Sequence, residues 1–550
     1  MARGVRIEGR ARRTLRRLRT GSEAAPLFAP CLGLVAAAFA VPMFHALLEG
    51  DERVARAFLY AGLFTGFAAA IIGVALAGRA RTATTQTELI TLLAAWILFP
   101  VFMAIPLVML TPQLGWVGAW FEMVLSFTTT GSTGYATLTR VDDSLHLWRG
   151  VVAWLGGLMT LTAAYVILAP RRMGGFEVRT QAFSLSDQTS TAVRLAELGA
   201  KAPAASTRVH RALRTILPVY AGMTVVLVML FGLAGEVSLA GVIHAFGIVS
   251  TAGVSPSAEG IALSGSIPIE MIAAVFLCAA ATSRFYGDAS RIGASVPLRE
   301  DPELRLMALL VLAATALLFV RHWSAALTLD NVEGQGGALT ALWGTAFTVL
   351  SYLTTTGYES TAWDSAQAWA GLTTPTLILL GLCALGGGAA TTAGGIKLIR
   401  AAVLLRHGMR EVERLAQPMA VHGRGEGSVS DGGLGEGAFL GWAFIMLYSG
   451  SIFAVTLALA MTGLNFQTSL VGAIAAVSNT GPAFAAVAEG HSSFANLDAL
   501  QRVILAAGMV LGRIETLAVI AIFRGQSWAL PLLVEKKGGN TGRKLPQSRR

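Results

Sequence analysis

The stretch "FTTTGSTGY" at residues 127–135 is unusual because of the sequence on either side of it. It follows the mostly apolar run "LGWVGAWFEMVLS" at residues 114–126, and a further apolar segment begins soon after it. Thr, Ser and Gly are poor residues for a helix interior, because they favour turns and caps. The chain is therefore predicted to leave the helical conformation here, between two apolar segments.

The composition indicates that the surroundings of this stretch are a lipid bilayer. Of the 550 residues, 54% are hydrophobic and 13% are charged, whereas a soluble chain carries about 25% charged residues. The first two apolar runs, at residues 29–48 and 58–77, are each long enough to cross a bilayer core of about 30 Å. We therefore predict an integral membrane protein. Cys31, Cys278 and Cys383 lie in apolar segments and show neither metal-ligand spacing nor a disulfide framework.

The basic residues are distributed as in a membrane protein rather than in a nucleic-acid-binding one. The formal net charge is +10, with eight Arg in the first 20 residues and seven Lys or Arg after residue 523. The connections at 251–269, 324–342 and 357–374 contain none. This alternation follows the positive-inside rule. It predicts a multi-pass protein of the cell inner (cytoplasmic) membrane, with an even number of spans, both termini cytoplasmic and no cleavable signal.

The hydropathy pattern divides the chain into about ten spans and four shorter apolar segments. The shorter segments cannot cross the bilayer and return, so each is predicted to be a half-membrane helix. The predicted spans, of which the eighth is interrupted, lie at 26–48, 57–78, 88–111, 146–170, 213–234, 266–287, 304–323, 373–406, 437–463 and 500–523. The predicted half-helices lie at 115–128, 238–249, 338–353 and 467–477.

A polar, Gly-bearing stretch follows each half-helix, and the four stretches form an internal repeat. Their sequences are "TTTGST", "STAGVS", "TTTGYE" and "SNTGPA", aligned on Gly131, Gly253, Gly357 and Gly481. Four units of span, half-helix, polar loop and span in one chain predict a pseudo-fourfold pore. The first copy could also be aligned on Gly134, but Gly131 is preferred because the three Thr before it match the third copy.

This repeat explains why polar stretches occur among apolar segments. Non-helical backbone at membrane depth is tolerated only where it is buried in protein or lines water. Four such loops around one axis offer rings of carbonyl oxygens, which can replace the hydration shell of a monovalent cation. Gly permits the positive φ angles that such rings require, and the half-helices direct their negative ends toward the ion. The predicted filter residues are Thr128, Thr129, Thr130, Gly131, Ser250, Thr251, Ala252, Gly253, Thr354, Thr355, Thr356, Gly357, Ser478, Asn479, Thr480 and Gly481.

Further motifs, taken together with the filter stretches, give the chain a resemblance to a known family. They are "WLGGLMTLTAAYVILAPRRMGGFEV" at 154–178, "GGGAATTAGGIKLIR" at 386–400 and "GMVLGRIET" at 508–516. With these motifs the chain resembles the potassium-translocating subunit of the Trk/Ktr/HKT superfamily, closest to the bacterial TrkH branch. The resemblance covers roughly residues 88–525, and the two additional N-terminal spans also fit that branch.

The resemblance implies what the protein transports and with what it assembles. It implies potassium as the transported ion, no organic cofactor, a homodimer of pore subunits and a separate cytosolic, nucleotide-binding regulatory ring that is TrkA-like. Members of the family with a Ser in the first filter tend to admit sodium. The four Gly of this chain therefore favour potassium over sodium.

The Gly-rich segment at 386–395 is predicted to interrupt the eighth span. It contains five Gly and no large side chain, and each Gly costs a helix about 1 kcal/mol; the alternative is a small-residue face for helix packing. The resemblance implies that this loop blocks or opens the path beneath the filter, although Ala390, Thr391 and Thr392 replace the usual Gly-Ser-Thr of the family. The predicted gate residues are Gly386, Gly387, Gly388, Ala390, Thr391, Thr392, Gly394, Gly395, Lys397 and Arg513.

Arg513 lies inside the last predicted span, where a charge is costly and usually faces a cavity or a partner. We interpret it as a positive charge near the pore, as a buried Arg satisfied by loop carbonyls, or as both. Glu515 is two residues away, so on a helix the two side chains point in different directions. Glu122, in the first half-helix, is interpreted mainly as a structural hydrogen-bonding group, and Lys397 as a cap of the break or a group facing the cytoplasm.

The predicted fold is an all-α polytopic membrane protein with about ten transmembrane helices. A cation pore or transporter is favoured over a polytopic membrane enzyme, because no acid, base or nucleophile set occurs at motif spacing. A channel-like uniporter and a sodium- or proton-coupled symporter both fit the sequence. The predicted divisions are a basic N-terminus at 1–25, two spans at 26–87, pore repeats at 88–200, 201–300, 301–424 and 425–525, and a basic tail at 526–550.

Overall fold

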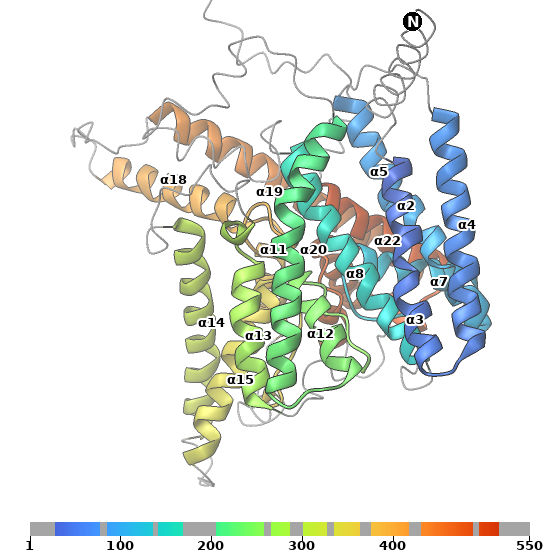
Figure 1. Ribbon diagram of the computed structural model, residues 1–550. Coiled ribbons are helices and arrows are strands. Elements are labelled where there is room, and N and C mark those ends of the chain that lie inside the picture. The colour runs from blue at the N-terminus through green and yellow to red at the C-terminus, as the bar shows by residue number, and fades with distance from the viewer. Residues whose placement is uncertain are drawn as a thin grey trace, which may run out of the picture.

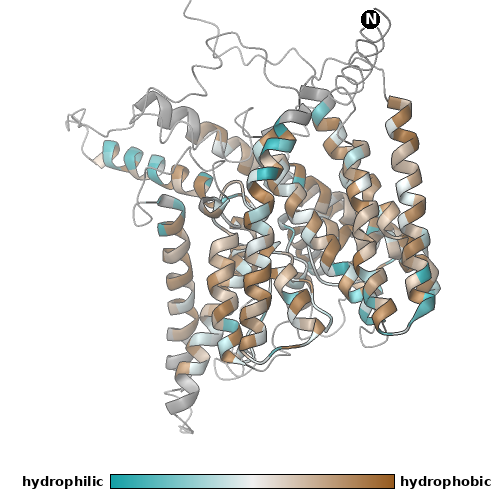
Figure 2. Cartoon of the chain, viewed as in Figure 1, coloured by the Kyte–Doolittle hydropathy of each residue, from teal (hydrophilic) through white to brown (hydrophobic). Residues whose placement is uncertain are grey.

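In the computed structural model, all regular secondary structure in the described part of the chain is helical. This agrees with the predicted all-α class. Most of the helices run side by side along one direction (Figure 1), and apolar residues cover most of their length (Figure 2). The described residues are 28–76, 85–135, 141–168, 205–257, 266–286, 301–326, 335–363, 376–416, 431–487 and 494–515.

Four units follow one another, each with a long helix, a half-helix, a polar loop and a second long segment. Each of the predicted half-helices is present, and the third begins at Gln335, three residues earlier than predicted. The first unit contains α5 (Thr85–Met103), α6 (Ile105–Leu110), α7 (Gly115–Phe127) and α8 (Asp143–Ala163). The second contains α11 (Ala205–Leu233), α12 (Leu239–Val249) and α13 (Ile267–Ala280), and the third α14 (Pro302–Ala326), α15 (Gln335–Leu353), α17 (Thr376–Leu385) and α18 (Leu398–Ala416). The fourth contains α19 (Asp431–Ala460), α20 (Phe466–Ser478) and α22 (Ala499–Ile514).

The two N-terminal spans pack against the first unit. They form α2 (Phe28–Ala38), α3 (Ala40–Leu48) and α4 (Glu52–Leu76), and the first span bends at Phe39 between α2 and α3. The Phe39 ring stacks on Trp148 of α8, with 4.3 Å between the ring centroids. Both side chains are fully buried, so this aromatic contact joins the extra spans to the pore units.

Six of the described helical segments are long and apolar enough to cross a membrane. Of the other predicted spans, α14 has 25 residues, α13 has 14 and α22 has 16. Helix α17 has 10 residues counted from Thr376, the first described residue of this segment. Helix α22 ends at Ile514 rather than at the predicted residue 523, and residues from 516 onward lie outside the described part of the chain. Helices α13 and α22, after the second and fourth loops, are thus shorter than the hydropathy pattern indicates.

The eighth segment is interrupted as predicted, but its second half differs from an ordinary span. Helix α18 continues to Ala416, ten residues beyond the predicted end, and lies across the direction of α14 (Figure 1). Exposed Leu405, Met409 and Val412 occupy one stripe of it, and charged residues give its outer part hydrophilic turns beside hydrophobic ones (Figure 2). Such an amphipathic helix favours an interface over the bilayer core, and it continues past the predicted limit at residue 406.

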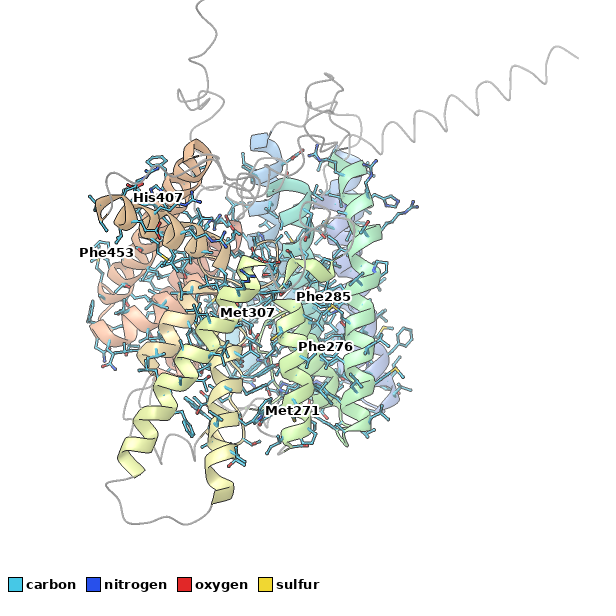
Figure 3. The ribbon with its side chains drawn as sticks, turned by 90° about the vertical axis from the view of Figure 1, so that its left-hand side faces the viewer. Met271, Phe276, Phe285, Met307, His407 and Phe453 are labelled. Atoms are coloured by element: carbon cyan, nitrogen blue, oxygen red, sulfur yellow. The ribbon has the colours of Figure 1, made fainter. Side chains whose placement is uncertain are left out.

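The outer surface of the helices is apolar, as expected for a protein surrounded by lipid. Leu63 and Phe67 of α4 are 64% and 65% exposed. Phe453 of α19 is 68% exposed and lies at the outer edge in Figure 3. An apolar surface of this extent would be unfavourable in water. The buried polar loops lie inside this apolar shell.

Candidate ion-conducting site

The four polar loops have the same backbone conformation at equivalent positions. The second residue of each predicted triplet is left-handed, with φ of 49° at Thr129, 51° at Thr251, 60° at Thr355 and 55° at Asn479. A β-branched residue at positive φ is a genuine outlier and strained. The left-handed residue is Thr in three loops and Asn in the fourth, and it follows the half-helix each time. It is therefore a repeated structural feature of the four units.

The hydrogen bonds that end the half-helices repeat in the same way. In each loop the amide of the third residue donates to the carbonyl oxygen five residues earlier, over 2.7–2.9 Å. The donors are Thr130, Ala252, Thr356 and Thr480, and the acceptors are Leu125, Gly247, Ser351 and Ala475. Each of the four loops therefore leaves its half-helix with the same hydrogen-bond geometry, so the four aligned stretches have equivalent backbone shapes.

The glycines that follow are equivalent in three of the four loops. Gly131, Gly253 and Gly357 have φ of 74°, 63° and 79°. The fourth loop departs from this pattern because Gly481 is not left-handed, and its amide donates to the carbonyl oxygen of Thr130 over 2.6 Å. The short helix α21 (Pro482–Val487) begins at the next residue and accounts for the different course of this loop.

The four loops close into a ring in chain order. A Cβ atom on Gly131 would lie 1.8 Å from the Ala252 carbonyl oxygen, and one on Gly253 would lie 2.0 Å from the Thr356 oxygen. A Cβ on Gly357 would meet the Pro482 ring at 2.8 Å. The Gly481 amide in turn bonds to the first loop, so each loop touches the next. Contacts this close leave no room for a side chain.

All sixteen predicted filter residues are buried. Within three loops the hydroxyl groups of the first and third residues contact each other, at 2.7 Å for Thr128 and Thr130 and 3.2 Å for Thr354 and Thr356. The Ser478–Thr480 pair is 3.3 Å apart. The second loop has Ala252 at the third position and lacks this pair. The ring is therefore fourfold in its backbone but not in its side chains.

A buried ion pair supports the outer end of the first loop. The Glu122 carboxylate lies 2.6 Å from Nε of Arg149 and accepts from the Gly134 amide at 2.6 Å. Arg149 also donates to the carbonyl oxygens of Ser132 at 2.7 Å and Ser255 at 3.0 Å, so it ties the first loop to the second. Gly134 thus contacts the supporting carboxylate, whereas Gly131 lies at the contact between loops.

Glu270 of α13 supports the third loop in a similar way. Its carboxylate accepts from the Ser360 hydroxyl at 2.6 Å, the Thr361 amide at 2.7 Å and the indole N–H of Trp343 at 2.9 Å. The sequence interpretation overlooked Arg149 and Glu270. A charged residue within an apolar segment is the signal that could have indicated both.

The Gly-rich break lies directly against the ring. The Gly394 amide donates to the Thr355 hydroxyl at 2.8 Å, and the Thr251 hydroxyl donates to Thr392 at 3.0 Å. A Cβ on Gly394 would lie 1.9 Å from the Ser478 carbonyl oxygen, so the fourth loop is equally close. The break therefore contacts the second, third and fourth loops, and the continuous packing helix considered as its alternative is absent at 386–397.

The backbone of the break takes several conformations that a helix cannot. Gly386, Ala390, Gly395 and Lys397 all have positive φ. The Gly388 amide donates to the Ala281 carbonyl oxygen at 3.1 Å, which fixes the loop to the end of α13. The remaining predicted gate residues, Gly387 and Thr391, lie buried in the same loop.

Arg513, in the last turn of α22, joins the break to the first filter loop. Its guanidinium donates to the carbonyl oxygens of Thr128 and Thr392 and to the Thr129 hydroxyl. Arg513 is 7% exposed, and every partner found for it is an uncharged oxygen. The two interpretations of Arg513, a charge beside the ring and an Arg satisfied by loop carbonyls, thus describe the same side chain.

Glu515 does not neutralise Arg513, in agreement with the sequence interpretation. Its carboxylate lies 2.8 Å from Nη2 of Arg400, whose guanidinium carbon also lies 3.7 Å from the centroid of the Phe444 ring. Lys397 is 8% exposed and donates to the Ala393 carbonyl oxygen, so it caps the break. Arg400 is a further buried charge that the sequence interpretation overlooked.

Comparison with known proteins gives relatives over most of the chain. Residues 61–530 match the model of the TrkH family, described as cation transport protein. The chain is 29% identical over 440 residues to the Trk system potassium uptake protein TrkI of Halomonas elongata, covering 79% of this chain and 82% of that protein. It is 27% identical over 454 residues to the Trk system potassium uptake protein TrkG of Escherichia coli, covering 81% and 86%.

A solved structure shares the fold. The crystal structure of the potassium transporter TrkH from Vibrio parahaemolyticus superimposes with a TM-score of 0.74 at 21% sequence identity, covering 92% of this chain and 99% of that one. Among the described residues no group of three or more His, Cys, Asp or Glu side chains could hold a metal ion. The family match sets aside the alternative of a membrane enzyme. The chain belongs to the TrkH family of cation transport proteins.

Proposed function

We propose that this protein carries potassium inward across the cytoplasmic membrane through the ring of four loops. The observation that carries the proposal is the repeated left-handed residue at Thr129, Thr251, Thr355 and Asn479. It gives four equivalent turns of backbone, buried within an apolar shell. The printed names of the relatives, which are potassium uptake proteins, support the choice of potassium.

The chemistry of the proposal is the replacement of water by carbonyl oxygens. An ion that enters the ring loses its hydration shell and gains backbone oxygens from all four loops. The C-terminal ends of the half-helices α7, α12, α15 and α20 add partial negative charge at the same place. The ring needs no ionised ligand, because four dipolar loops supply the field.

The break at 386–395 is proposed to be the gate. It is buried against three filter loops, and Arg513 ties it to the first. A loop of small residues can obstruct the path and yet move aside with little repacking, because few side chains must be displaced. The two positive charges of Lys397 and Arg513 add an electrostatic barrier for a cation on the inner side of the ring.

The assembly and orientation of the protein follow from the family as proposals. We place the protein in the inner membrane with both termini cytoplasmic, as a homodimer that docks a TrkA-like nucleotide-binding ring. The divisions at 1–25, 26–87, 88–200, 201–300, 301–424, 425–525 and 526–550 are proposed as its sequence units. A cytosolic partner that alters flux when nucleotide is added would support this assembly, and fully regulated flux from the purified pore protein would contradict it.

Flux measurements on the full chain in lipid vesicles test the proposed function. We expect entry of potassium or rubidium that excess sodium does not block, and that needs no sodium or proton gradient. Two variants with the same backbone angle provide a matched comparison. Gly253 (φ 63°) has a carbonyl oxygen 2.0 Å from its would-be Cβ, whereas Gly115 (φ 64°) has no neighbour within 4 Å.

Gly253→Ala should therefore lower the potassium-over-sodium flux ratio by about tenfold, while Gly115→Ala retains the parent ratio. Equal flux ratios in the two variants would contradict the ring as the conducting site. Flux that appears only with a sodium or proton gradient would instead favour the symporter.

A further inference from the structure

A small cavity lies beside the gate loop, which is the break at residues 386–395 together with Lys397. Its volume is about 30 Å³, and its lining comes from the loop, α5, the end of α8 and α22. Lys397 and Thr391 come from the loop, Arg513 from α22 and Trp96 from α5. These residues bring the amino group of a lysine, a guanidinium and an indole N–H to the wall of one small space.

Hydrogen-bond donors in this wall exceed the acceptors available to them. An ammonium group has three N–H donors and a guanidinium has five. Among the described residues the ammonium of Lys397 donates only to Ala393, and Nη1 of Arg513 donates only to Thr392. The indole N–H of Trp96, whose side chain is 1% exposed, has no partner there. At least four N–H bonds are thus left over.

The polar oxygens of the wall are already engaged in the structure. The Glu515 carboxylate pairs with Arg400 at 2.8 Å. The Thr391 hydroxyl donates to the Gly388 carbonyl oxygen at 2.7 Å, and the Thr160 hydroxyl donates to Gly156 at 2.9 Å. Neither hydroxyl carries a charge, so neither compensates the cations. The cavity is therefore complementary to an acceptor of hydrogen bonds.

The charges of the wall favour an anionic acceptor over a neutral one. Lys397, Arg513 and Glu515 line the cavity, and Glu515 pairs with Arg400 outside it. The Glu303 carboxylate, which accepts from the Ala389 amide, also acts on Lys397. Three cationic side chains thus stand against two carboxylates. Uncompensated buried charge is strongly destabilising, because the ion has lost its water. A bound anion would offset this excess and satisfy the unused N–H donors together.

The size of the cavity restricts the anion. A space of about 30 Å³ has room for about two water-sized probes, which fits a single halide and not a tetrahedral oxyanion with its ligands. We propose that the cavity binds one small monovalent anion of halide size, held by Lys397, Arg513 and Trp96. Because these residues belong to the gate loop, α22 and α5, the anion links the three elements and stabilises the closed position of the loop.

Binding is tested on the purified full chain, without any measurement of transport. Thermal unfolding is followed in a series of potassium bromide against potassium gluconate at constant potassium concentration. We expect a bromide-specific, saturable rise in melting temperature, since a ligand that binds only the folded state stabilises it. Crystals grown in bromide should show one anomalous peak in the cavity.

The variants are chosen to separate the site from general effects of charge. Lys397→Met and Trp96→Phe should weaken bromide binding by about tenfold or more, the range expected for losing a charge-assisted hydrogen bond. Arg406→Gln removes an exposed positive charge of α18 outside the cavity and should leave binding unchanged, and Trp116→Phe is the matched control for the indole. If Lys397→Met fails to fold, Trp96→Phe still gives the result.

Two outcomes would overturn the proposal. One is the absence of both a bromide-specific shift and an anomalous peak, which would mean that the cavity holds water only. The other is undiminished bromide binding by both Lys397→Met and Trp96→Phe, which would mean that the anion binds outside this cavity. Neither outcome bears on potassium uptake, because the measurement does not use the filter.

Discussion

Gly131 and Gly357 offer a matched pair for testing how the ring is built. Both are left-handed, at 74° and 79°, so an added Cβ strains the backbone equally at the two positions. The neighbours differ. At Gly131 the new Cβ would lie 1.8 Å from the backbone oxygen of Ala252, and at Gly357 it would lie 2.8 Å from a carbon of the Pro482 ring.

The magnitude follows from these distances. Real Cβ atoms essentially never come closer than 3.0 Å to another heavy atom. In Gly131→Ala the Ala252 carbonyl must therefore move by more than 1 Å, whereas in Gly357→Ala the Pro482 ring must move by a few tenths of an ångström. The left-handed Cβ costs about 1–2 kcal/mol in both. Only the first change displaces an oxygen that the proposal gives to the ion.

We expect Gly131→Ala to lower potassium-over-sodium selectivity by about tenfold, or about 1.4 kcal/mol, and Gly357→Ala to lower it clearly less. Rubidium and sodium uptake into vesicles, normalised to folded and inserted protein, measures the ratio. Gly50→Ala serves as the control for backbone strain alone, because its φ is 80° and no atom lies within 4 Å of the new Cβ. Equal loss of selectivity in Gly131→Ala and Gly357→Ala would refute the reasoning from carbonyl displacement.

Three further predictions concern the gate and the buried charges. Deleting part of 388–393 should raise flux by about tenfold for each 1.4 kcal/mol of barrier removed while the selectivity ratio stays at the parent value; unchanged flux, normalised to inserted protein, would make the break a packing feature. Arg513→Ala should raise normalised flux more than Glu515→Ala, since Arg513 touches both the loop and the ring, and the reverse order would contradict its place in the gate. Glu122→Gln should destabilise the folded state by about 3–5 kcal/mol, because it leaves Arg149 as a buried charge without its carboxylate; an unchanged melting temperature in nanodiscs would show that the pair contributes nothing.

The fourfold repeat could be predicted from the sequence because each unit repeats the same local pattern of apolar and polar residues. A half-helix must end where Thr and Gly replace apolar residues, so the four loops and the break at 386–395 could be located without coordinates. The left-handed angle at Thr251 and its equivalents could not be predicted, because Thr rarely adopts it and only the surrounding packing enforces it.

Hydrogen bonds and ion pairs between residues far apart in the sequence could not be predicted from residue spacing. The Arg400–Glu515 pair joins residues separated by 115 positions, and Arg149 reaches Ser255 across 106. Nothing in the spacing of these residues indicates which charge meets which. The end of α22 at Ile514 was also unexpected, because apolar residues continue beyond it while the backbone at Glu515 turns to a φ of 63°.

The missing hydroxyl at Ala252 has a consequence for how this pore can vary. A pore built from four identical chains must accept each substitution four times at once. Here one gene specifies four quadrants separately, and one of them already lacks the hydroxyl pair found in the other three. A single substitution would therefore alter one of the four loops of the proposed ion path and leave three as they were. One substitution can thus change ion preference by a smaller amount here than in a symmetric tetramer, where the same substitution alters all four subunits.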